Sequence, residues 1–228
     1  MAKGKMIVFE GLDGSGKQTQ SELFYQKLIG MNKKVMKISY PRYDNASSSL
    51  VKMYLAGEFG TDPAAVNAYA ASTFFAVDRY ASYKQDYEKF YKDGGFIIAD
   101  RYTTSNMLHQ GSKIDDSTER GKFLEWLWQL EFVLYGLPVP DYVFFLDMSL
   151  KGTKKLTNKR ANKITGGEKK DIHEASENHL TRAYEIADEL IERYGWIRIA
   201  CMREKTIRDI EDIGRELMEI FIEKEGKI

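Results

Sequence analysis

A glycine-rich stretch near the start of the chain has the composition of a phosphate-binding loop. Residues 11–19 read Gly-Leu-Asp-Gly-Ser-Gly-Lys-Gln-Thr; they follow the apolar run 6–9 and open into the helix-like segment 18–29. The glycines let the backbone curl so that successive N–H groups point inward, and a helix start adds free amides and a positive dipole end. Lys17 adds a point charge for the outer phosphates. Strand, glycine loop and helix in this order predict a polyphosphate cradle rather than a simple turn.

The residue after the lysine departs from the usual pattern of such loops. That position normally carries Ser or Thr, whose hydroxyl binds Mg²⁺, but here it is Gln18, and a hydroxyl follows only at Thr19. An amide oxygen can also approach a hard cation or one of its water ligands. The metal ligand in the loop is therefore open between Gln18 and Thr19. The residues predicted to hold the polyphosphate are Gly11, Leu12, Asp13, Gly14, Ser15, Gly16, Lys17, Gln18 and Thr19.

A second polar element, Asp100-Arg101-Tyr102-Thr103-Thr104-Ser105, follows another apolar run. A carboxylate at this point lies beside the phosphate-binding strand in a doubly wound sheet, so Asp100 can bind Mg²⁺ directly or through water. The planar guanidinium of Arg101 suits bidentate phosphate binding. The alternative is a structural Asp–Arg ion pair that closes the strand end.

A further arginine shares a helix face with an aromatic ring. Phe75 and Arg79 are four residues apart in a helical segment, so their side chains are neighbours. The pair is suited to stacking on a base and binding a phosphate. The alternative places Phe75 in the core and Arg79 in a surface ion pair.

Composition limits the class of protein. The chain has 228 residues, which suits one α/β domain spanning 1–228, and Lys plus Arg equals Asp plus Glu at 34 each. We therefore expect no attraction to nucleic acid or membrane. One cysteine, Cys201, and the absence of a signal pattern or long apolar run predict a cytoplasmic protein. The three histidines are dispersed and no His/Cys cluster has zinc spacing.

Short apolar runs alternate with helical patterns along the whole chain. The alternation predicts an α/β fold with a five-stranded parallel sheet and helices on both faces. Ligands gather at the carboxyl ends of such strands, which is where the polar elements lie. The last helix is expected to have Ile207, Ile210, Ile213, Leu217 and Ile220 on one face and a capping box from Thr206 to Asp209. The predicted strands are Lys5–Phe9, Lys34–Ser39, Gly95–Ala99, Tyr142–Leu146 and Trp196–Ile199.

Two segments have a composition that allows two interpretations. Residues 151–170 are rich in lysine around the tip Thr165-Gly166-Gly167, which fits either a mobile lid over phosphates, at about 151–172, or a solvated basic loop. The second segment is apolar over most of its circumference, which fits either a homodimer interface or complete burial within the monomer. It carries Phe123, Leu124, Trp126, Leu127, Trp128, Leu130 and Leu134.

Together these pieces resemble the thymidylate kinases, a family of P-loop nucleoside monophosphate kinases, along nearly the whole chain. The ordered set is more specific than any single motif. It comprises Phe9-Glu10-Gly11 and the loop, Tyr40-Pro41-Arg42, Phe74-Phe75-Ala76-Val77-Asp78-Arg79, Asp100-Arg101-Tyr102-Thr103-Thr104-Ser105, Gln110-Gly111, Pro140-Asp141 and Leu146-Asp147.

The resemblance implies transfer of the γ-phosphoryl group of ATP to dTMP with Mg²⁺, by a homodimer. It places Lys17 and the loop amides on the donor phosphates, Asp13 beside the sugar 3′-hydroxyl, and Asp100 on the metal. It assigns the catalytic roles to Lys17, Arg101, Asp13 and, in the lid, Arg160, because this loop has no arginine. The implied acceptor site consists of Asp13, Arg42, Phe75, Arg79, Arg101, Ser105 and Gln110.

Two other functions remain open at this level. A deoxynucleoside kinase would use the same cradle on an uncharged acceptor, although two arginines would then have no anion to bind. A catalytically inactive nucleotide-binding protein would account for Gln18 and for a lid rich in lysine rather than arginine.

Overall fold

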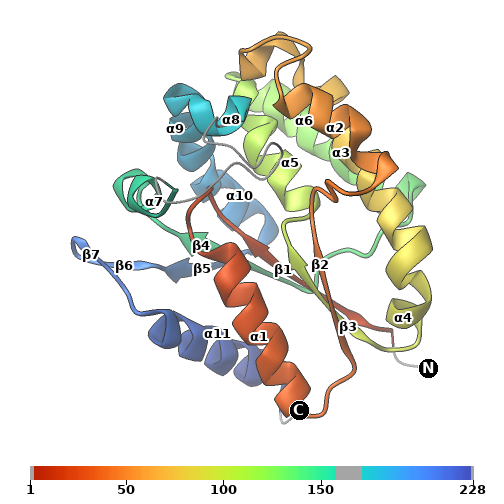
Figure 1. Cartoon of the computed structure of the whole chain (residues 1–228), viewed down its shortest axis with the longest axis vertical. Helices are drawn as coiled ribbons and strands as arrows, with labels where there is room; N and C mark the ends of the chain where they lie inside the picture. Colours follow the sequence, from red (N-terminus) through yellow and green to blue (C-terminus); the bar gives the residue numbers. More distant parts are fainter. Residues whose placement is uncertain (1–2, 158–170, 227–228) are drawn as a thin grey trace.

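Five parallel strands form the centre of the molecule in the computed structural model, which describes residues 3–157 and 171–226 (Figure 1). Their order is β2-β3-β1-β4-β5, so the strand before the glycine loop lies in the middle of the sheet. Each predicted strand agrees with the observed one to within one residue at either end. The strands are β1 (Lys5–Glu10), β2 (Val35–Ser39), β3 (Phe96–Asp100), β4 (Tyr142–Asp147) and β5 (Ile197–Ala200).

Both faces of this sheet are covered by helices, as the apolar strands predict. On one face, Ile7 and Phe9 of β1 belong to a buried cluster with apolar side chains of α1 (Lys17–Gly30) and α11 (Ile210–Glu225), two helices that lie side by side in Figure 1. On the other face, Met6 and Val8 belong to a second buried cluster, which includes side chains of helices between residues 68 and 194. Successive side chains of one strand thus enter two separate cores.

The other helices gather over the second face and around the carboxyl ends of the strands (Figure 1). The α-helices are α2 (Ser49–Leu55), α3 (Ala68–Ser82), α4 (Glu88–Lys92), α5 (Thr103–His109), α6 (Ser117–Trp128), α7 (Leu150–Thr157), α8 (Ile172–Ala175), α9 (Glu177–Glu185) and α10 (Ala187–Tyr194). Short 3-10 turns are η1 (Ala46–Ser48), η2 (Pro63–Ala65) and η4 (Gly111–Lys113). Two π-helical turns, η3 (Tyr83–Tyr87) and η5 (Gln129–Leu134), extend α3 and α6.

The start of the last helix differs from the prediction. Thr206 and Ile207 belong to β7 (Thr206–Ile207), which pairs antiparallel with β6 (Met202–Arg203), and Asp209 precedes the helix. The Thr206 hydroxyl donates to the carbonyl of Arg203 within the hairpin, so the predicted capping box is wrong. Ile210 is 49% exposed, and the helix buries Ile213, Leu217, Met218 and Phe221.

The apolar segment at 123–134 divides between core and surface. Phe123, Leu124 and Leu127 are buried within the monomer, whereas Leu134 is 70% exposed. Val77 and Tyr80 of α3 are also exposed apolar side chains, so exposed apolar surface is not confined to this segment. Within residues 3–157 and 171–226, no helix has both the length and the apolar character needed to cross a bilayer.

Candidate active site

The glycine loop between β1 and α1 has the backbone conformation that binds anions. Gly11, Gly14 and Gly16 have φ values of 142°, 81° and 92°, which residues with a Cβ rarely adopt. Gly16 is the N-cap of α1 and provides no side-chain acceptor, so the first-turn amides of this helix are available to a ligand. The predicted cradle thus has its expected geometry, with amides and the positive end of the helix dipole at one place.

The lysine of this loop lies buried against its own backbone. Lys17 Nζ donates to the carbonyl oxygens of Gly11 (2.7 Å) and Leu12 (2.8 Å). Burial lowers the pKa of Lys17 to about 8, and the neighbouring positive charge of Arg101 acts in the same direction. The ammonium group is therefore charged at neutral pH but close to its titration range.

A cavity of about 370 Å³ opens next to the loop at the carboxyl edge of the sheet. Two residues of the loop, Asp13 and Gln18, contribute to its lining, so the phosphate cradle and this cavity are adjacent. The structure brings most residues of the predicted acceptor site together here. Those that line the cavity are Asp13, Phe75, Arg79, Arg101, Ser105 and Gln110.

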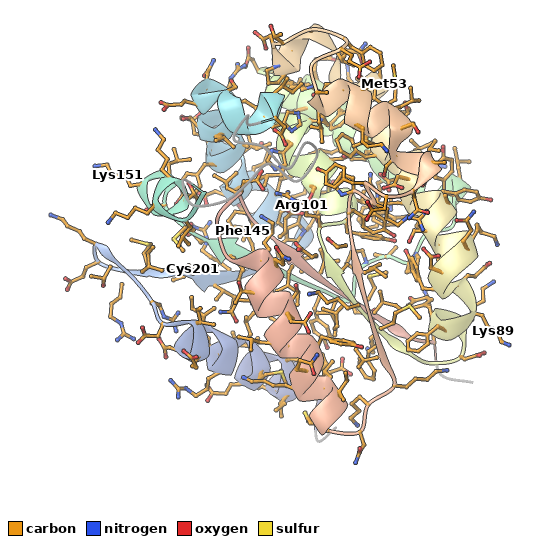
Figure 2. All side chains as sticks on the ribbon, viewed as in Figure 1. Met53, Lys89, Arg101, Phe145, Lys151 and Cys201 are labelled. Carbon is orange, nitrogen blue, oxygen red and sulfur yellow. The ribbon has the colours of Figure 1, made fainter. Side chains whose placement is uncertain are left out.

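Carboxylates hold Arg101, whose side chain is labelled in Figure 2, in the lining of this cavity. Its guanidinium bonds to Asp13 of the loop and lies 3.8 Å from a carboxylate oxygen of Glu10. Burial opposes its charge, but Asp13 and Glu10 together raise the pKa of Arg101. The φ of Arg101 is 69°, a conformation that costs free energy in a residue with a side chain and is concentrated at functional sites.

Arg79 has a different environment, because a buried glutamate fixes it. Its Nε and Nη2 each lie 2.6 Å from an oxygen of Glu131, in a bidentate pair that is closed to solvent. The Thr103 hydroxyl donates to the same carboxylate at 2.8 Å. The alternative of a surface ion pair for Arg79 is therefore wrong. Sequence analysis did not identify Glu131, although an acid between Leu130 and Phe132 in an apolar segment is a signal for a buried partner.

Glu10 organises the strand ends although it is fully buried. Its carboxylate accepts bonds from the Thr104 hydroxyl (2.7 Å), the Ser105 hydroxyl (2.6 Å) and the Gly11 amide (2.9 Å). It thereby joins the glycine loop to the Asp-Arg-Tyr element, which lie far apart in sequence. Sequence analysis included Glu10 only as part of a motif and assigned it no role.

The other cavity residues supply an aromatic face and an amide. Phe75 is half-buried and meets the ring of Tyr54 edge to face, with centroids 6.2 Å apart. Gln110 is buried, and its carboxamide oxygen has no hydrogen-bond partner among the residues that the structure describes. Such an oxygen is available to a ligand.

One predicted residue lies elsewhere, and another is not among the described residues. Arg42 is absent from the cavity lining, where its neighbour Tyr43 is found. The Arg42 side chain instead bonds to Asp78, Asp86 and the Ser47 hydroxyl. Arg160, and with it the central part of the predicted lid, lies outside the described residues.

The residues proposed for a metal offer oxygen ligands. Asp100 ends β3 directly opposite Phe9 of β1, is 5% exposed, and interacts electrostatically with both Lys17 and Arg101. Gln18 and Thr19 follow in the first turn of α1, and Gln18 reaches the cavity. A buried carboxylate, an amide and a hydroxyl beside a phosphate cradle fit Mg²⁺, which binds one or two protein oxygens together with water and phosphate.

The three histidines are not dispersed in space, which corrects the sequence prediction. His109, His173 and His179 lie together, each buried, with one ring nitrogen of each within 4.8 Å of the others. His109 and His173 also line the cavity. Spacing along the chain gave no signal, because the fold and not the local sequence joins α5 to α8 and α9.

Comparison with known proteins gives one consistent family. A model of the family "Thymidylate kinase" matches residues 9–212. The thymidylate kinase of Mycobacterium tuberculosis is 29% identical over 162 residues, 71% of this chain and 74% of that protein. That of Plasmodium falciparum is 28% identical over 224 residues, 98% of this chain and 94% of that protein. A solved structure of thymidylate kinase from Candida albicans has a similar fold, with a TM-score of 0.69 at 24% identity over 99% of this chain and 93% of that one.

The buried pair of Arg79 and Glu131 predicts a large loss of stability on removal of one charge. Glu131→Gln leaves the guanidinium buried without a counter-charge, and we expect the free energy of unfolding to fall by about 3–5 kcal/mol in urea denaturation. Glu125→Gln on the same helix is the control, because Glu125 pairs with Arg193 at the surface and its loss should change stability by less than about 1 kcal/mol. Equal effects of the two substitutions would contradict the assignment.

The lowered pKa of Lys17 predicts that triphosphate binding weakens with rising pH. Below about pH 8 the ammonium group is charged and attracts phosphate, and above it the charge is lost. We expect the Kd of ATP, measured by calorimetry, to rise about tenfold between pH 7 and pH 9. Lys17→Met should bind weakly with little pH dependence, and this variant also corrects for titration of ATP itself. A constant Kd in the unsubstituted protein would refute the role of this charge.

Proposed function

The chain belongs to the thymidylate kinase family, and we propose how its residues carry out the reaction of that family, transfer of the γ-phosphoryl group of ATP to dTMP to give dTDP and ADP. The observation that carries the proposal is the adjacency of two anion sites. The glycine loop supplies amides and Lys17 for a triphosphate, and the cavity beside it supplies two guanidinium groups for a monophosphate. Asp13 and Gln18 belong to both.

The loop is the proposed donor site. The amides of residues 11–19 would bind the β- and γ-phosphates, and Lys17 would leave its two carbonyl acceptors to follow the γ-phosphate. In the transfer step an oxygen of the dTMP phosphate attacks the γ-phosphorus, and the bond from that phosphorus to the β–γ bridging oxygen breaks. Because little covalent help is needed, positioning and charge are what the protein supplies.

The cavity is the proposed acceptor site. Arg79, oriented by Glu131, and Arg101, oriented by Asp13 and Glu10, would bind the dTMP phosphate from two directions. Phe75 would stack on thymine, and Gln110 and Ser105 would contact the polar edge of the base. Asp13 would lie beside the sugar 3′-hydroxyl. Arg42, which binds Asp78 and Asp86, would contribute only after a change of partners.

Mg²⁺ is part of the proposal. Asp100 would hold it directly or through water, with the Gln18 oxygen or the Thr19 hydroxyl as a further ligand. When bound, the ion offsets the negative charge on the β- and γ-phosphate oxygens.

The remaining cationic contact is proposed to come from a lid. The glycine loop contains no arginine, so we assign this contact to Arg160. Arg160 lies outside the described residues. We propose that it belongs to a lid at about 151–172 and that the chain is a single domain, 1–228. The flanking helix α7 carries Lys151, Lys154 and Lys155, which extend the basic character of this region. Neutralisation of charge on the transferring oxygens is the role that this arginine would fill.

We also propose a homodimer in the cytoplasm. Exposed apolar side chains on α3 and η5 support an interface there, with Val77 47%, Val133 56% and Leu134 70% exposed. Such side chains on neighbouring elements are suited to a symmetric contact. Cys201 is a free, buried thiol, which is compatible with a reducing compartment.

Incubation with ATP, Mg²⁺ and each nucleoside monophosphate in turn tests the activity. We expect dTMP to give dTDP and ADP in equal amounts, and thymidine to remain unchanged because it offers no anion to Arg79 and Arg101. The proposal fails if dTMP is not phosphorylated while thymidine or another monophosphate is. Chromatography of the nucleotide products separates these outcomes.

Substitution of Arg101 tests the acceptor site specifically. Loss of a charged donor in Arg101→Ala removes about 1.5–3 kcal/mol of binding, so we expect the KM for dTMP to rise at least about tenfold and kcat to fall, with the Kd of ATP changed less than about threefold. Arg198→Ala is the matched control, because Arg198 and its partners Asp147 and Asp188 do not line the cavity. Equal losses for dTMP and ATP would remove the assigned role.

A further inference from the structure

The fold brings all three histidines of this chain to one buried place. His109 is the last residue of α5, His173 belongs to α8, and His179 to α9. They are 5%, 6% and 6% exposed, and their rings lie against one another, with centroids of His173 and His179 4.4 Å apart. The reaction proposed above uses none of them.

The nitrogen atoms of this triad have the separation of metal ligands. His109 Nδ1 and His179 Nε2 are 3.4 Å apart, which is long for a hydrogen bond between rings. Two nitrogens bound to one tetrahedral Zn²⁺ at about 2.0–2.1 Å lie about 3.3–3.4 Å apart. The third ring has a nitrogen within 4.8 Å of the other two. A small movement of His173 would therefore complete a three-nitrogen site.

The environment keeps these rings neutral, which is the form that binds metal. Burial, followed by the positive charge of Arg101, holds the pKa of His109 well below its usual value. Burial and the nearby Lys113 lower the pKa of His179 to about 4. Protons therefore compete little with a metal ion at neutral pH.

A tyrosine orients the third ring from outside the triad. The Tyr54 hydroxyl lies 2.8 Å from His173 Nε2 and accepts a bond from Lys113 Nζ at 2.7 Å. In the tautomer of His173 that carries its proton on Nε2, Tyr54 accepts this bond and directs its own proton to the carbonyl of Pro63, at 3.4 Å. The lone pair of His173 Nδ1 then remains for a metal. Oxygen partners that fix the second ring nitrogen are the usual support of metal-binding histidines.

We propose that His109, His173 and His179 bind one divalent transition-metal ion of the zinc class, with its open position toward the cavity that His109 and His173 line. Three imidazoles select such ions over Mg²⁺, which prefers oxygen. The ion would bind α8 and α9 to α5, next to Arg101, by coordinate bonds in addition to packing. This site is separate from the proposed Mg²⁺ site at Asp100, and metal binding alone tests it without reference to the kinase reaction.

Titration of the untagged full chain with Co²⁺ and Zn²⁺ tests the site, after treatment with a chelator and its removal. We expect one Co²⁺ per chain with the visible absorption of a four- or five-coordinate ion, a Kd of about 1 µM or lower, displacement by one equivalent of Zn²⁺, and no displacement by millimolar Mg²⁺. In NMR spectra the ring signals of all three histidines should shift together. Zn²⁺ at about 100 times its Kd should raise the thermal midpoint by about 5 °C or more.

Variants separate this site from adventitious binding. His179→Gln should weaken Co²⁺ binding at least about 100-fold, and Tyr54→Phe, which keeps all three ligands, about tenfold. Cys201→Ala removes the only thiol and should leave the affinity unchanged. The proposal is overturned if the unsubstituted chain binds no Co²⁺ at micromolar concentration, if its histidine signals do not move, or if His179→Gln binds as tightly. The signals of the unsubstituted chain decide the matter even if His179→Gln fails to fold.

Discussion

Balance of buried charge at the carboxyl edge of the sheet is the constraint on which the rest of this structure depends. Three cations lie in the glycine loop or in the lining of the cavity beside it, and each is at most slightly exposed: Lys17, Arg79 and Arg101. A buried cation without partners is too costly to keep. The fold therefore surrounds them with Glu10 and Glu131, both fully buried, and with carbonyl oxygens. These pairs, together with apolar contacts, hold the elements around the cavity in place.

The two arginines are held in ways that suit different tasks. Arg79 bonds through two nitrogens to Glu131, which a threonine also fixes, so its orientation is set before any ligand arrives. Arg101 bonds to Asp13, which lies on the glycine loop and is partly exposed. A phosphate can replace Asp13 at little cost, because one anion is exchanged for another. The proposed acceptor site thus combines a fixed guanidinium with an exchangeable one.

The sequence predicted most of the framework and most of the residues that line the cavity, but not the buried partners that hold them. The strands could be recognised because strands covered on both faces are continuously apolar. The loop could be recognised because its glycines are needed for the conformation of that same short segment. The partner of Arg79 was not recognisable, since Glu131 lies on another helix and only tertiary packing brings them together. The same reason applies to the histidine triad. The capping box failed because a two-residue hairpin at Thr206 competed for the same side chain.

In the proposed reaction the glycine loop would also couple the binding of the two substrates. In this structure Lys17 bonds to the carbonyls of Gly11 and Leu12, and Arg101 to Asp13, so both exchangeable cations have their partners on one short segment. Each also raises the cost of charging the other, since Arg101 lowers the pKa of Lys17. A phosphate bound at either site would offset part of that repulsion, and it would replace the group of the loop that the cation contacts. Binding of one anion should therefore favour the other, and the loop brings donor and acceptor together before either group reacts.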